Sequence, residues 1–454
     1  MKKKKLLFTT TRMIAIGFFA AIVLGTILLS LPIAAKGRSA VPVIDALFTA
    51  TSSTCVTGLT TVATAYSWSL FGQIVILLLI QFGGLGIVTF TTTILLLLGR
   101  RISLRDRLLI QEAYNLDTLQ GLVKITIRIV KGALFVEGVG AILYSIQFIR
   151  DFGFLRGVWY SIFHAVSAFC NAGLDLLGTD SLAGYRGNVL INIVTMLLII
   201  LGGIGFPVWW DFLDNLRRLR RKHKRNEPMK FEFCLHSRIA VSATIALIIS
   251  GALFTFLMEY DNPETLGNLP FGETVMACLF QSVTLRTAGF QTIPQQCFRD
   301  GTSMIFLLLM LIGGSPSGTA GGIKTVTAVL VFASVLSTVK GKETGFMKRK
   351  FSARTEKKAF AVLGVSLGAL FVLTTLLLVV QQSDFLDTLY EMVSAVATVG
   401  LSRNFTGNLK TAGKFIVVLG MYLGRIGPIT MALAVNKKHS GGKIAYPEGK
   451  VLIG

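Results

Sequence analysis

The chain has 454 residues, of which 52% are hydrophobic and only 15% are charged, and its mean hydropathy is +0.67. Soluble domains carry about 25% charged residues, so this composition excludes a large soluble enzyme. The net charge of +22 would suit nucleic-acid binding, but the basic residues gather at the ends of apolar stretches. Such clusters mark the cytoplasmic ends of membrane spans, and we expect an integral membrane protein that binds no nucleic acid.

Apolar stretches of about 18 residues or more, long enough to cross a bilayer, recur along the chain, most clearly at residues 13–35, 70–98, 189–210 and 304–339. Basic clusters lie at residues 2–5, 100–107, 217–225, 340–358 and 437–438. Placing all five on one side of the membrane requires two crossings between successive clusters. This predicts an all-α polytopic protein with eight spans and both termini in the cytoplasm. A signal peptide at the lysine-rich start is the alternative, but no small-residue cleavage site follows.

One sequence unit recurs four times between these clusters. Each copy reads as a long apolar helix (M1), a short semi-polar helix, a small-residue turn and a second long apolar helix (M2). The turns end in Gly58, Gly173, Gly289 and Gly400, which are separated by 115, 116 and 111 residues. A serine stands six residues before the glycine in three copies, whereas Val283 takes that place in the third. The predicted units are residues 1–107, 108–232, 233–350 and 351–440, with a tail at 441–454.

A second motif in M2 keeps step with the first. It reads Gly83-Gly84-Leu-Gly86, Gly202-Gly203-Ile-Gly205, Gly313-Gly314-Ser-Pro316 and Gly424-Arg425-Ile-Gly427. One such motif would mean only close helix packing. Two motifs in step through four copies indicate internal repetition.

The semi-polar segments at 43–54, 156–169, 271–283 and 385–397 are too short to span a membrane but suit re-entrant helices. Four such helices around one pseudo-four-fold axis would direct their negative C-terminal ends toward its centre. Glycine permits the positive φ that lets successive carbonyls face one way, and rings of carbonyls replace the hydration shell of potassium. The turns therefore predict a carbonyl filter formed by Val56, Thr57, Gly58, Asn171, Ala172, Gly173, Thr287, Ala288, Gly289, Thr398, Val399 and Gly400.

The turns also indicate which ion would pass. No acidic residue lies within three positions before any of the four glycines, whereas pores for divalent cations usually use carboxylate rings. A monovalent cation is therefore expected. Only Thr398-Val399-Gly400 closely resembles the filter of potassium channels, so we expect lower selectivity than in a channel with a longer filter.

No other constellation points to a cofactor or to catalysis. The five cysteines show no C-x-x-C spacing and are expected to be packing residues. The four histidines show no ligand spacing, no P-loop is present, and Gly138 and Gly140 lie inside an apolar span where a dinucleotide-binding motif fails its context. We expect neither an enzyme nor a resident cofactor.

The four M1–pore helix–M2 units, the single filter glycines and the lone Arg425 in the last M2 resemble the Trk/Ktr/HKT potassium transporter superfamily. The short N-terminus, the eight expected spans and the closing stretch from Tyr446 to Val451 are similar to a bacterial KtrB/KtrD-type membrane subunit. The resemblance covers essentially the whole chain. It implies uptake of K+ across the bacterial plasma membrane, often dependent on Na+ as an activating or coupled ion. It also implies a homodimer that works with a cytosolic nucleotide-binding RCK-domain ring of the KtrA/KtrC type. With no nucleotide motif of its own, the chain would be regulated in trans through residues 217–225, 340–358 and 446–454.

M2 of the third unit departs from the others. Proline is about 3 kcal/mol and glycine about 1 kcal/mol less favourable than alanine inside a helix, so five glycines and one proline in ten residues predict a break. A benign kink is one reading, and the resemblance favours an intramembrane loop that blocks the pore and moves on opening. The residues concerned are Gly313, Gly314, Ser315, Pro316, Ser317, Gly318, Thr319, Ala320, Gly321 and Gly322.

Arg425 takes the place that a glycine holds in the other three M2 motifs. A charge at mid-membrane is unfavourable and usually faces a cavity; its central place in residues 415–435 disfavours snorkelling to an interface. We expect Arg425 beneath the filter, where it raises the barrier to cations and bonds to loop carbonyls. Lys324 is expected to be a similar gate element. Arg286 fits a functional role and a structural contact of the pore helix equally well.

A secondary transporter for a small organic solute is the alternative function. Such folds usually contain inverted repeats and a midplane substrate pocket. Here each unit contains two expected spans, so all four copies share one orientation, as a pore on a pseudo-four-fold axis requires.

Overall fold

The computed structural model describes residues 10–37, 40–97, 102, 107–108, 122–223, 231–347 and 349–427. Within them the first unit contains α1 (Thr10–Leu29), α2 (Val43–Cys55), α3 (Thr64–Ser67), α4 (Leu70–Leu85) and α5 (Ile87–Leu97). The second contains α7 (Leu122–Phe152), α8 (Phe154–Phe169), α9 (Val189–Gly203) and α10 (Phe206–His223). The third contains α11 (Leu235–Glu259), α12 (Phe271–Thr284), α13 (Asp300–Leu311) and α14 (Thr325–Val339). The fourth contains α15 (Ala353–Gln381), α16 (Phe385–Ala397) and α17 (Thr411–Ile426).

Little other regular structure accompanies these helices. Two short antiparallel strands, β1 (Gly345–Phe346) and β2 (Arg349–Lys350), pair after α14. Single 3-10 turns lie in the loops: η1 (Pro32–Ala34), η2 (Ala183–Tyr185), η3 (Gln295–Cys297) and η4 (Thr406–Asn408). The predicted all-α fold is confirmed.

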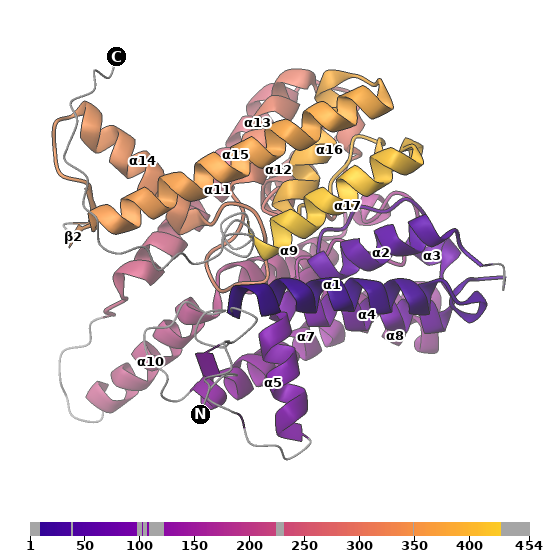
Figure 1. Cartoon of the computed structure of the whole chain (residues 1–454), viewed down its shortest axis with the longest axis horizontal. Helices are drawn as coiled ribbons and strands as arrows, with labels where there is room; N and C mark the ends of the chain where they lie inside the picture. The colour runs from indigo at the N-terminus through magenta and orange to yellow at the C-terminus, as the bar shows by residue number, and fades with distance from the viewer. Residues whose placement is uncertain are drawn as a thin grey trace, which may run out of the picture.

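The four units close into a ring by one repeated contact. M2 of each unit packs against the short pore helix of the next: α4 against α8, α9 against α12, and α13 against α16. The ring closes because α17 packs against α2 and α1, so the last unit lies beside the first (Figure 1). Within each unit M1 packs on its own pore helix. This is the cyclic arrangement that four copies of equal orientation require.

The long helices have the length and hydropathy of membrane spans. α7, α11, α15 and residues 12–29 of α1 each qualify alone, whereas α9 and α10 meet the same test only when the two bent helices are counted together. Between 28% and 33% of the most apolar window of the four single helices is buried in the protein, so most of that surface faces outward, as lipid requires. The eight-span count and the cytoplasmic termini stay predictions; residues 2–5, 437–438 and 441–454 lie outside the described residues.

Two M2 segments that were expected as apolar spans are interrupted as well. The span expected at residues 70–98 ends one helix at Leu85 and resumes at Ile87, and the span expected at 189–210 bends by 96° after Gly203. The residue at each break is a glycine with positive φ: Gly86 at 84° and Gly205 at 92°, while Gly427 at 88° ends α17. These are the third glycines of the M2 motif, and they favour this backbone because they lack a Cβ.

Candidate functional site

The four turns share one backbone conformation. The turn glycines Gly58, Gly173, Gly289 and Gly400 have φ angles of 104°, 64°, 80° and 93°, which confirms the expected positive φ. The residue two positions earlier is also left-handed in every copy, at 57°, 59°, 65° and 52° for Val56, Asn171, Thr287 and Thr398. Three of these residues are β-branched, for which positive φ is strained. Strain of this kind persists where surrounding structure enforces it, commonly at functional sites.

The turn glycines meet one another in a closed ring. A Cβ built on Gly58 would lie 2.7 Å from Ala172 O, one on Gly173 would lie 2.7 Å from Ala288 O, and one on Gly289 would lie 2.8 Å from Val399 O. A Cβ on Gly400 would overlap Thr57 O and so return to the first unit. Each glycine therefore lies against the carbonyl that precedes the glycine of the next unit. No side chain fits at any of the four positions.

Hydroxyl groups of the pore helices hold the turns. Ser52 Oγ accepts a bond from Gly58 N at 3.0 Å, and Ser394 Oγ accepts one from Gly400 N at 3.0 Å. Ser167 Oγ donates to Leu174 O at 2.6 Å. In the third unit, where valine takes the serine position, Thr284 Oγ1 donates to Phe290 O at 2.5 Å. The recurring serine thus anchors the segment around the glycine, and the third unit keeps the hydroxyl by moving it one residue.

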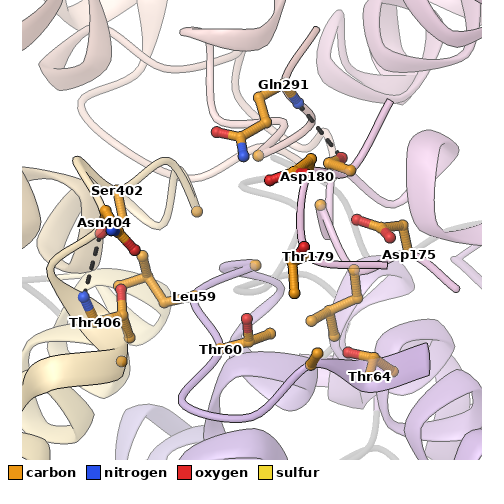
Figure 2. A pocket seen from close by; sticks show the side chains of 18 of the residues that line it. Leu59, Thr60, Thr64, Asp175, Thr179, Asp180, Gln291, Ser402, Asn404 and Thr406 are labelled. Atoms are coloured by element: carbon orange, nitrogen blue, oxygen red, sulfur yellow. Dashed lines mark hydrogen bonds between the residues drawn. The ribbon is translucent and has the colours of Figure 1, made fainter. Parts of the chain in front are cut away.

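A cavity of about 350 Å³ opens beyond the ring and is lined by all four units. Figure 2 shows Asp175 and Asp180 on one side of it, facing Ser402, Asn404 and Thr406 across the opening. All lining acids of this cavity come from the second unit. The negative charge of these two acids raises the local concentration of cations in the cavity.

Glu391 supports the opposite wall of this cavity. Its carboxylate is fully buried in α16 and accepts bonds from Ser402 Oγ at 2.7 Å and Thr406 Oγ1 at 2.6 Å. Glu391 lies nine residues before its turn glycine, and His164 holds that position in the second unit, where Leu176 N donates to its Nε2 at 3.5 Å. Sequence reasoning missed both residues. The signal available was their common place in the repeat.

The first M2 glycine sits against the end of a pore helix. A Cβ on Gly83 would overlap Thr54 O, one on Gly202 would overlap Phe169 O, and one on Gly424 would overlap Val396 O. These carbonyls all lie four residues before the turn glycine of the same unit. In the third unit a Cβ on Gly313 would instead overlap Gly321 O. The broken helix of that unit therefore replaces the pore-helix contact by a contact within its own loop.

The expected break in the third M2 is confirmed, since α13 ends at Leu311 and α14 begins at Thr325. The intervening segment, here called the M2 loop (residues 312–324), folds back on itself: Ile323 N donates to Leu311 O at 2.9 Å and Gly313 N to Ile323 O at 3.0 Å. It also bonds to the second unit, through Ser315 N to Gly203 O at 2.8 Å and Thr319 N to Gly202 O at 3.1 Å. The loop is thus an ordered element held by neighbouring M2 glycines.

Two basic side chains bind carbonyls of the M2 loop. Arg425 Nη1 donates to Thr319 O at 2.5 Å, while its Nη2 donates to Gly83 O. Lys324 Nζ donates to Ala320 O at 2.6 Å. The expected contact between Arg425 and loop carbonyls is therefore present. Arg425 joins the M2 loop of the third unit to M2 of the first.

The M2 loop also contacts three of the four turns that contain the turn glycines. Thr319 Oγ1 donates to Phe169 O at 3.0 Å and lies 3.2 Å from the side-chain amide of Asn171. A Cβ on Gly321 would overlap Thr398 Oγ1. The structure thus brings the sequence-predicted turn residues of three units and the loop into one contact region, since Gly321 N also donates to Thr287 Oγ1 at 3.1 Å.

Four turns that meet in one ring, inside a bundle of long apolar helices, define a helical membrane protein built on four similar units. The TrkH family model, described as a cation transport protein, matches residues 5–446. The chain belongs to this family of cation transport proteins, which are not enzymes. It is 40% identical to the Ktr system potassium uptake protein B of Bacillus subtilis over 98% of this chain and 97% of that protein. It is 36% identical to the potassium/sodium uptake protein NtpJ of Enterococcus hirae over 100% of this chain and 99% of that protein. The fold is similar to the crystal structure of the potassium transporter TrkH from Vibrio parahaemolyticus, with a TM-score of 0.69 and 18% identity, covering 96% of this chain and 87% of that one.

Proposed function

We propose that this chain is the translocation subunit of a potassium-uptake system. The observation that carries the proposal is the closed ring in which each turn glycine lies against the carbonyl before the next turn glycine. Carbonyl oxygens in a ring replace the hydration shell of a monovalent cation. The filter consists of the twelve turn residues named from the sequence, and the names of the relatives from Bacillus subtilis and Enterococcus hirae support potassium as the ion.

The charges around the ring favour this reading. The acids Asp175 and Asp180 lie at the cavity beyond the turns, where they attract cations without supplying a ring of carboxylates. Such a ring would favour divalent ions. Sodium acts as an activating or coupled ion in this proposal, and the name of the Enterococcus hirae relative, a potassium/sodium uptake protein, supports that role.

The M2 loop with Arg425 and Lys324 forms the gate. Loop residues contact the turns from below, and two cationic groups bind loop carbonyls at the same place. Positive charge on the conduction path raises the free energy of a cation there. In the closed state the loop therefore acts as both a steric and an electrostatic barrier, and opening requires Arg425 to release Thr319 O.

The transporter works in the plasma membrane of a bacterium as a homodimer with a cytosolic nucleotide-binding RCK-domain ring. The names of relatives as parts of a Ktr system support more than one component. The exposed Arg217 and Arg218 in α10 and the basic residues around β2 are candidate contact points for such a partner.

The test is ion flux through the purified full chain in liposomes. Potassium or rubidium uptake that exceeds sodium uptake, and that is absent from empty liposomes, is the expected result. The assay is run with and without sodium to measure the sodium dependence. Uptake of small organic solutes without rubidium flux would support a secondary transporter and overturn the proposal.

A further inference from the structure

We infer that Arg286 and Thr287 couple the third filter turn to the M2 loop, so that ion selection and gate position are linked. This inference rests on the proposed filter and gate. It assigns Arg286 as a positioning residue, a role that neither the sequence pattern nor the membership of the family supplies.

Arg286 and Thr287 bind the two strands of the M2 loop where they lie side by side, at Gly313 and Gly321, here called the loop neck. Arg286 Nη2 donates to Gly313 O at 3.3 Å, and Thr287 Oγ1 accepts a bond from Gly321 N at 3.1 Å. Gly313 and Gly321 themselves face each other, because a Cβ on Gly313 would overlap Gly321 O. A displacement of the neck away from the turn therefore breaks both bonds together.

Arg286 is buried, with 7% of its surface exposed, and its Nε has no hydrogen-bond partner among the described residues. No carboxylate within the described chain forms an ion pair with it. A buried guanidinium without a countercharge depends strongly on the carbonyl dipoles around it. Gly313 O supplies one of these, so the position of the loop affects the free energy of the charge beside the filter.

The comparison between units supports this assignment. Arg286 lies three residues before its turn glycine, and the same position holds Cys55, Cys170 and Ala397 in the other three units. The arginine thus occurs in the one unit whose M2 contains the loop. The threonine that follows is left-handed, with φ at 65°, and this conformation accompanies the contact of its hydroxyl with the loop.

Coupling between two sites is reciprocal. A change that frees the loop should therefore alter selection at the third turn. A change at the third turn that removes a bond to the loop should alter resting flux. These two effects distinguish coupling from a separate filter and a separate gate.

The decisive comparison is Thr287→Val against Thr398→Val in full-length protein reconstituted in liposomes. Valine keeps the β-branched shape of threonine and removes the hydroxyl. Thr398 holds the same turn position in the fourth unit, but its Oγ1 has no hydrogen-bond partner in the described structure. Both variants remove a hydroxyl next to the filter, whereas only Thr287→Val removes a bond to the loop. Resting potassium flux should rise about two- to tenfold more in Thr287→Val, the change expected from one net hydrogen bond.

Arg286 is tested by exchange to glutamine and to lysine. Arg286→Gln should raise resting flux and change the potassium-to-sodium flux ratio, whereas Arg286→Lys, which keeps a charged donor, should restore part of both. Where Arg286→Gln does not fold, as judged by gel filtration, the Thr287→Val comparison still decides. Equal resting flux in Thr287→Val and Thr398→Val overturns the coupling.

The reciprocal measurement uses Arg425→Ala, which changes the gate without touching the third turn. Coupling predicts higher potassium flux together with a shifted potassium-to-sodium ratio. Higher flux with an unchanged ratio overturns the coupling and leaves the proposed gate intact. No change in flux in Arg425→Ala contradicts the proposed gate itself, so the two failures can be told apart.

Discussion

Lys414 Nζ lies 2.5 Å from Asp45 Oδ1, and this ion pair joins the last unit of the chain to the first. Asp45 is in the first turn of the pore helix α2, and Lys414 is in the first turn of α17. Both side chains are largely buried, with 10% and 15% exposed. The pair therefore closes the ring of units where α2 and α17 begin.

Removing one member of this pair should weaken the ring. Asp45→Asn or Lys414→Met should each lower stability by about 1–3 kcal/mol, the range for losing a hydrogen bond to a buried charged group. The double variant should lose less than the sum, because no unpaired charge remains. Thermal unfolding of the detergent-solubilised protein measures this. As a control, Lys350→Met removes the exposed pair of Lys350 with Glu343 and should change stability little. Additive losses in the double variant would contradict a pairwise role.

The turn glycines should tolerate no side chain. Gly58→Ala, Gly173→Ala, Gly289→Ala and Gly400→Ala each place a Cβ against a carbonyl of the neighbouring turn and add strain at positive φ. We expect a lower potassium-to-sodium flux ratio or weaker apparent potassium affinity in each. The matched control is Gly368→Ala in α15, where a Cβ would meet no atom within 4 Å; it should behave as the wild type. Unchanged discrimination in all four turn variants would refute the carbonyl ring.

Glu391 should act through the two hydroxyls it holds. Glu391→Ala leaves Ser402 and Thr406 without their acceptor, so this wall of the cavity beyond the turns should loosen. Potassium flux should fall by about thirtyfold, for two net hydrogen bonds of about 1 kcal/mol each. Glu391→Gln keeps an acceptor oxygen and should fall less. In a double-mutant cycle with Thr406→Val, the two losses should not add, since one bond is removed twice. Independent losses would show that Glu391 acts elsewhere.

The gate is tested by a change in the loop and a change in its partner. Shortening the M2 loop between Ser315 and Ala320 should raise potassium flux, because it removes the steric barrier and the carbonyl that Arg425 binds. Arg425→Ala should also raise flux, since it removes a charge that opposes cations. Potassium flux in the combined variant should be close to that of either single variant, because both changes remove the same contact between Arg425 and Thr319 O. Folded variants with wild-type or lower flux would place the gate elsewhere.

Much of the fold could be predicted because it depends on local patterns. The four pore helices lie within about two residues of their expected ends, since each is a short apolar-faced helix bounded by turn residues. The break in the third M2 follows from glycine and proline propensities alone. The breaks at Gly86 and Gly205 were missed, although each ends a motif with three glycines in four residues, because glycines in apolar spans also serve close helix packing.

The amino-acid sequence by itself thus determined the repeat, the position of each turn and the left-handed glycine in it, because these depend on neighbours within a few residues. Only the tertiary structure decided which polar groups meet. Along the sequence, Arg286 and its partner Gly313 O are 27 residues apart, and Arg425 and Thr319 O are 106 apart. Lys414 and Asp45 are 369 residues apart. Periodicity reports which face of a helix avoids water or meets lipid, but it holds no information on the partner across a ring. Closing four similar units around one axis selects those partners, since each M2 packs on the next pore helix and brings distant residues to one depth.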